Sequence, residues 1–109
     1  MTTDVATVRE RLREIGQQIR TAAEAVDGDT GASPVLAAVV REFRSKSAKG
    51  LEVLGNGAGA DTARECVIEL EQAGDSAKAA AEADTGASET TRQAVLDAHL
   101  AICMFKAGA

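Results

Sequence analysis

The stretch VATVRERLREIGQQIRTAAEAV, residues 5–26, decides the fold of this chain. Its apolar side chains recur at alternating spacings of three and four residues, which is the period of one face of an α-helix and not of a β-strand. These side chains are Val5, Val8, Leu12, Ile15, Ile19, Ala22 and Val26. We therefore predict a long amphipathic helix whose apolar seam packs against other helices.

Start signals in the sequence predict three further helices. Ser33 followed by Pro34 is typical of an N-cap and first helical position, and Ser88 is a second N-cap candidate. Thr62 and Glu65 have the spacing of a capping box, which predicts a third start. The predicted helices cover about residues 4–27, 34–54, 61–83 and 88–107. The sequence thus predicts an all-α chain, a single domain over residues 1–109, folded as an antiparallel up-down four-helix bundle.

An internal repeat relates the two halves of the chain. Residues 29–33, Asp-Thr-Gly-Ala-Ser, recur as residues 84–88, an offset of 55. At this offset, without gaps, 13 of 54 aligned positions are identical, and the apolar seam stays in phase, since Leu12 aligns with Val67. We interpret the chain as a duplicated helical hairpin.

The charge of the chain is negative and unevenly spread. Residues 1–50 carry eight basic and seven acidic groups, whereas residues 51–109 carry four basic and ten acidic groups, so that the net charge is −5. An acidic protein repels the phosphate backbone, and Phe43 and Phe105 are the only aromatic residues on which a base might stack. We therefore expect no nucleic-acid partner.

We expect neither a membrane-spanning segment nor a secretory signal from the sequence. No run of about 18 apolar residues occurs, which predicts no membrane span. The first residues lack a basic segment followed by an apolar one, so we expect no signal peptide. Two cysteines do not make a disulfide framework. The expected location is the cytoplasm.

Cys66, His99 and Cys103 form the candidate metal set of the sequence. His99 and Cys103 lie four residues apart on one predicted helix, so both can face the same direction, and Cys66 belongs to the preceding helix. A histidine and two thiolates suit zinc. The chain has no Cys-x-x-Cys motif and no second histidine, so the spacing does not specify a site, and ordinary core positions are the alternative interpretation.

Nothing in the sequence predicts an enzyme. Nucleophilic catalysis needs a base that a third group orients. Asp97 lies two residues before His99 and therefore points to another face of the same helix. We expect no catalytic residue and no cofactor.

Two surfaces are candidates for protein contacts. The last predicted helix is apolar around much of its circumference, which is typical of a helix covered by a partner, and the second helix carries a basic concentration. The candidate interaction residues are Arg41, Arg44, Lys46, Lys49, Leu96, Leu100 and Phe105. The leading hypothesis is a non-enzymatic interaction or assembly module that contacts a second copy of itself or another helical protein. The alternative is a metal- or ligand-binding bundle.

Lys49 and Gly50 form a Lys-Gly pair on the second helix of the predicted bundle. This short segment resembles histidine phosphotransfer domains, in which a phospho-accepting histidine precedes a Lys-Gly pair by three residues. Lys46 occupies that position here and cannot accept a phosphoryl group as an imidazole does. The resemblance implies, as a third hypothesis, a phosphotransfer-like adaptor without transfer activity.

Overall fold

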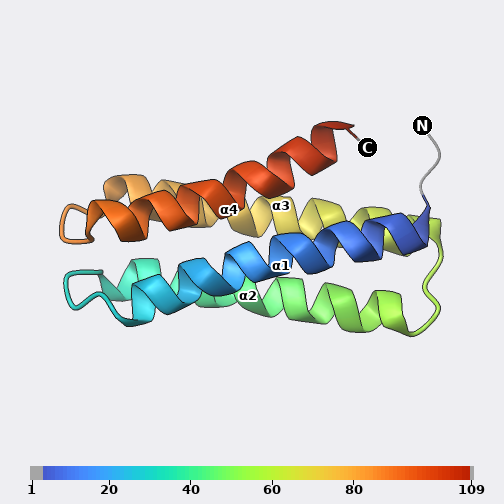
Figure 1. Cartoon of the computed structure of the whole chain (residues 1–109), viewed down its shortest axis with the longest axis horizontal. Coiled ribbons are helices and arrows are strands. Elements are labelled where there is room, and N and C mark those ends of the chain that lie inside the picture. The colour runs from blue at the N-terminus through green and yellow to red at the C-terminus, as the bar shows by residue number, and fades with distance from the viewer. Residues whose placement is uncertain (1–3, 109) are drawn as a thin grey trace.

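The computed structural model describes residues 4–108, and these residues form four α-helices and no strand (Figure 1). The helices are α1 (Val5–Asp27), α2 (Pro34–Gly55), α3 (Ala60–Ala83) and α4 (Glu89–Gly108). Each boundary lies within one residue of the predicted one. The all-α prediction is confirmed.

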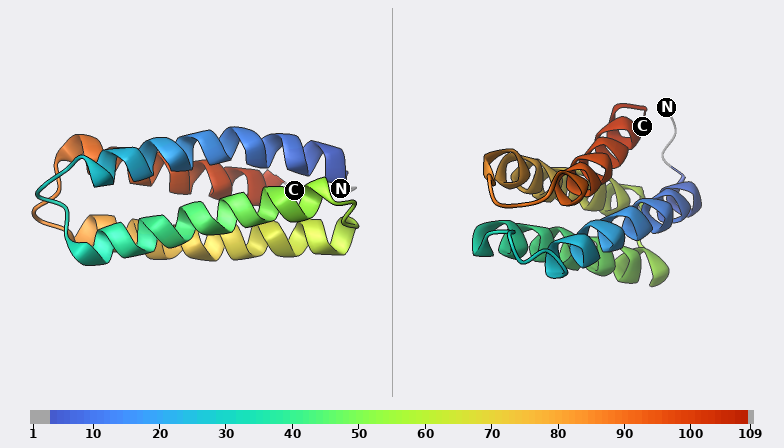
Figure 2. Two further views of the ribbon diagram at one scale, coloured as in Figure 1. Left: turned by 90° about the horizontal axis from the view of Figure 1, so that it is seen from below. Right: turned by 60° about the vertical axis from the view of Figure 1, so that its left-hand side comes forward.

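The helices form a ring in which every helix packs against two neighbours. α2 contacts α1 and α3, and α4 contacts α3 and α1, while α1 and α3 touch little across the diagonal. Successive helices run in opposite directions along a body of 42 × 23 × 17 Å (Figures 1 and 2). The predicted antiparallel four-helix bundle is therefore confirmed.

The apolar seam of α1 lies in the core, as its spacing predicts. Leu12, Ile15 and Ile19 are each at most 3% exposed. Phe43 of α2 and Ile102 of α4 are fully buried with them. α3 contributes mostly small side chains to this core, which lets its neighbours approach closely.

Two of the three predicted N-caps are confirmed. The backbone N–H of Leu36 donates to Ser33 Oγ at 3.1 Å, and the N–H of Thr91 donates to Ser88 Oγ at 3.1 Å. The Thr62–Glu65 capping box is wrong. α3 begins at Ala60 after an extended Gly59, so Thr62 already has helical neighbours on both sides and cannot adopt the non-helical backbone of an N-cap.

The two turns with the repeated sequence lie side by side at one end of the bundle (Figure 1). The backbone N–H of Ser33 donates to Asp84 Oδ2, and the N–H of Ser88 donates to Asp29 Oδ2, both at 2.8 Å. Each aspartate therefore accepts a hydrogen bond from the backbone of the serine in the other turn, and the two bonds hold the turns together. These accepted bonds lower the pKa of both Asp29 and Asp84, because they stabilise the ionised carboxylates.

The same turns touch through their glycines. A Cβ atom at Gly31 would collide with the carbonyl oxygen of Gly86, and a Cβ at Gly86 would collide with that of Gly31. The repeated turn thus makes equivalent contacts in both copies. Origin of the two hairpins by duplication stays a prediction.

We expect Gly31→Ala to lower the free energy of unfolding by about 1–3 kcal/mol, because the methyl group forces two backbone segments apart. Gly28→Ala is the matched control, since a Cβ there makes only ordinary contacts of 3.5 Å or more. Urea unfolding of both variants measures the difference. Equal stability of the two variants would contradict the close approach of the turns.

Candidate metal centre

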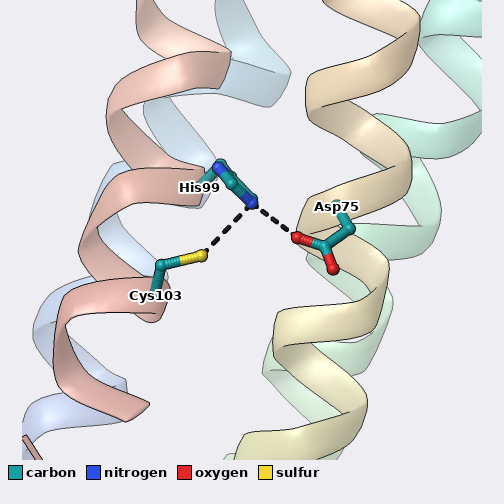
Figure 3. A group of neighbouring side chains, drawn as sticks. All are labelled: Asp75, His99 and Cys103. Atoms are coloured by element: carbon teal, nitrogen blue, oxygen red, sulfur yellow. Dashed lines mark hydrogen bonds and ion pairs between the residues drawn. The ribbon is translucent and has the colours of Figure 1, made fainter. Parts of the chain in front are cut away.

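His99 and Cys103 face the same direction from α4, as their spacing predicts. Cys103 Sγ lies 3.2 Å from His99 Nε2, and both side chains point toward α3 (Figure 3). The His99 side chain is only 13% exposed, so the ring lies largely inside the groove between the two helices. This places a nitrogen and a sulfur atom together at one point of the α3–α4 interface.

Asp75 of α3 completes the cluster. Its Oδ1 lies 2.7 Å from His99 Nε2, and the ligand atoms of Asp75, His99 and Cys103 all lie within 4.8 Å of one another (Figure 3). The sequence analysis missed this residue. The hairpin offered a signal: counting from Gly86 in the turn, Asp75 lies eleven residues before and His99 thirteen after, so antiparallel helices bring them level.

Cys66 lies elsewhere. It precedes Asp75 by nine residues, which on an α-helix is about 13.5 Å of rise and half a turn of rotation. It faces α2, where a Cβ at Gly50 would stand 3.7 Å from its own Cβ. The structure therefore brings together two of the three candidate ligands from the sequence and supplies a carboxylate in place of the third.

Gly74 makes room for the histidine ring. A Cβ atom at this position would lie 3.3 Å from His99 Cδ2 and 3.2 Å from the ring of Phe43. Such contacts are tighter than side chains ordinarily accept, so the ring of His99 packs directly on the backbone of α3. The imidazole therefore contacts the α3 backbone at Gly74 as well as the carboxylate of Asp75.

Negative charge surrounds the thiol. Burial raises the pKa of Cys103, and the carboxylates of Asp75 and Glu71 raise it further, against a smaller opposing effect of nearby lysines. One of these, Lys106, lies 3.3 Å from Glu71 Oε1. The thiol is therefore protonated at neutral pH and is not an activated nucleophile.

The contacts do not form a catalytic triad. In a triad, the nucleophile and the carboxylate use different ring nitrogens, whereas Cys103 and Asp75 both contact His99 Nε2. This nitrogen carries at most one proton, so it serves one of the two partners at a time. The three potential ligand atoms lie within 4.8 Å of one another, close enough for one metal ion to contact all of them.

The predicted apolar surface of α4 is divided in the structure. Leu100 is 55% exposed, whereas Leu96 is partly buried and Phe105 packs against the core, with the guanidinium of Arg11 5.6 Å from its ring centroid. Met104, which the sequence analysis did not single out, is 66% exposed. Leu100 and Met104 lie one turn apart on the outer face of α4.

Among the basic residues of α2, Lys46 forms ion pairs with carboxylates of its own chain. Lys46 Nζ lies 3.6 Å from Glu69 of α3 and 3.9 Å from Glu42 of α2. Lys49 is exposed beside them, at the groove between α2 and α3. Arg41 and Arg44 are exposed. The Lys46 side chain is 34% exposed and is paired with these two carboxylates. The adaptor hypothesis stays a prediction.

Comparisons with protein-family models, curated proteins and solved structures gave no match. None of the helices formed by residues 5–108 has the length and apolar character that crossing a membrane requires.

We expect Asp75→Asn to lower the pKa of Cys103, because it removes a neighbouring negative charge. Thiolate absorbance, followed against pH in a Cys66→Ser background, measures the titration of this one thiol. Asp97→Asn is the control, since Asp97 is exposed on α4 and bonds to Gln93 instead. An unchanged titration in Asp75→Asn would contradict the described cluster.

Proposed function

We propose that this chain binds a divalent transition-metal ion, with zinc as the best match, between α3 and α4. The observation that carries the proposal is the convergence of Asp75 Oδ1, His99 Nε2 and Cys103 Sγ within 4.8 Å. Carboxylate, imidazole and thiolate are all established zinc ligands. The proposal keeps His99 and Cys103 from the sequence hypothesis and exchanges Cys66 for Asp75.

The distances suit a metal after a small adjustment. Zinc bonds of about 2.0–2.3 Å place tetrahedral ligand atoms roughly 3.3–3.7 Å apart. The contact of 2.7 Å between His99 Nε2 and Asp75 Oδ1 would have to lengthen by about 0.6 Å, and the contact of 3.2 Å between His99 Nε2 and Cys103 Sγ by roughly a few tenths of an ångström.

The local charge also supports a cation. The carboxylates that raise the pKa of Cys103 disfavour a thiolate without a metal, and they attract a divalent ion. Binding would deprotonate the thiol, so affinity is expected to increase with pH. Asp75 is 56% exposed, which leaves the site open to solvent for a fourth ligand.

We expect cobalt(II) to bind stoichiometrically and to give a sulfur-to-metal charge-transfer band. Cys103→Ser should abolish the band, and His99→Ala should weaken binding at least tenfold, because each removes one ligand. Cys66→Ser is the matched control and should keep the full band. Circular dichroism checks that every variant is folded.

Two outcomes would overturn the metal proposal. One is the absence of a charge-transfer band in the unmodified protein at stoichiometric cobalt. The other is a band that Cys66→Ser abolishes and Cys103→Ser retains, since that would place the metal at the α2–α3 side of the bundle. Displacement of bound cobalt by added zinc then shows which of the two ions binds more tightly.

A second candidate function is self-association through α4. Leu100 and Met104 are exposed beside the partly buried Leu96, and the three form one apolar line along the helix. A second copy can present the same line in antiparallel orientation, which makes the surface self-complementary. The line is narrow, so the dimer is expected to be weak. This is the interaction module of the sequence hypothesis, and it is non-enzymatic.

We expect sedimentation velocity to show an association that strengthens with protein concentration. Leu100→Glu should weaken the dimer at least tenfold, because it buries a charge in the apolar line. Val35→Glu is the matched control, since Val35 is 66% exposed at the start of α2 and away from α4. A monomer at millimolar concentration would contradict the proposal.

A further inference from the structure

A groove of about 350 Å³ lies between α1 and α2, on the hairpin that does not carry the metal cluster. Each helix contributes residues spaced by three, four and seven positions, which is one helical face. The lining residues are Arg13, Gly16, Gln17, Arg20, Arg44, Ser47, Ala48 and Leu51. We call this feature the arginine groove.

The lining of the arginine groove is cationic and contains no carboxylate. Arg13 forms an ion pair with Glu10, with Nη1 and Oε2 3.0 Å apart. Arg20 and Arg44 form no ion pair with any of residues 4–108. Two guanidinium groups, from two different helices, are therefore free to bind a ligand in a chain whose net charge is −5.

The floor of the arginine groove holds a polar group that faces the opening. Ser47 is only 6% exposed, and its hydroxyl makes no hydrogen bond within residues 4–108. Every fully enclosed polar side-chain atom of these residues has a partner, so the Ser47 hydroxyl opens onto the groove. Gly16 leaves space for this hydroxyl, because a Cβ atom at position 16 would lie 3.0 Å from Ser47 Oγ.

The arginine groove is the counterpart of the metal cluster. At the offset of 55 that aligns the repeated turns, Arg20 aligns with Asp75 and Arg44 aligns with His99. The same place on the two hairpins thus carries an anion and an imidazole in one copy and two guanidinium groups in the other. The charge that selects a cation in the second hairpin is reversed in the first.

We propose that the arginine groove binds a phosphate group, either as free phosphate or as the phosphoryl end of a small ester. Guanidinium groups donate paired hydrogen bonds to phosphate oxygens. Arg20 lines the groove from α1 and Arg44 lines it from α2. Gln17 and Ser47 add neutral donors between them. A phosphate has oxygens in several directions, so donors from both walls and from the floor suit it better than a planar carboxylate.

The test is isothermal titration calorimetry at constant ionic strength, with inorganic phosphate in one arm and glycerol phosphate in the other. We expect saturable binding with one site per chain. Arg20→Gln and Arg44→Gln should each weaken it at least tenfold, and Ser47→Ala should weaken it several-fold. Arg41→Gln is the matched control, because Arg41 is exposed on α2 and does not line the groove.

Tighter binding of the ester identifies a phosphorylated small molecule as the ligand, and equal or tighter binding of inorganic phosphate identifies the free ion. The proposal is overturned if neither probe saturates at millimolar concentration, if Arg41→Gln weakens binding as much as Arg44→Gln, or if an acidic peptide binds more tightly than both probes. Cys103→Ser protein should bind phosphate with unchanged affinity. The phosphate result can therefore be interpreted whether or not the chain binds a metal ion.

Discussion

The two repeated turns, residues 29–33 and 84–88, hold the two helical hairpins together at one end of the bundle. Each helical hairpin turns at one of these segments, and the glycines and aspartates hold the two turns against each other. An α-helix is a stiff rod with a fixed rise of about 1.5 Å per residue. The turn at residues 84–88 fixes the register of α3 against α4, and this register places Asp75 level with His99 although each lies more than ten residues from Gly86.

Much of the fold is predictable from local pattern. The spacing of the α1 seam, the Ser33–Pro34 start and the Ser88 cap each depend on residues close in sequence, and the structure confirms them. The start of α3 is not predictable in this way, because Gly59 has no capping side chain and Thr62 competes with it on sequence alone. The mutual contact of the turns is also invisible to local pattern, since it joins segments 55 residues apart.

The candidate metal centre is predictable only in part, for the same reason. His99 and Cys103 belong to one helix, and helical geometry alone puts them on one face. Asp75 comes from another helix, so its place requires the register of the hairpin. Cys66 has suitable chemistry, but its rotation around α3 directs it toward α2. Ligand type alone therefore does not show which third residue lies beside His99 and Cys103, whereas ligand type combined with register points to Asp75.

The two hairpins place different chemistry on one scaffold. At the offset of 55, the positions of Asp75, His99 and Cys103 correspond to Arg20, Arg44 and Ala48, which line the groove between α1 and α2. The uneven charge of the chain agrees with this difference, since its first 50 residues are nearly neutral and the remaining residues are strongly acidic. The side chains at these positions differ between the hairpins, whereas the glycines of the two turns are the same. The shared contact of the turns therefore leaves the α1–α2 and α3–α4 sides of the bundle free to differ in charge, because that contact depends on the turn residues and not on the side chains along the helices.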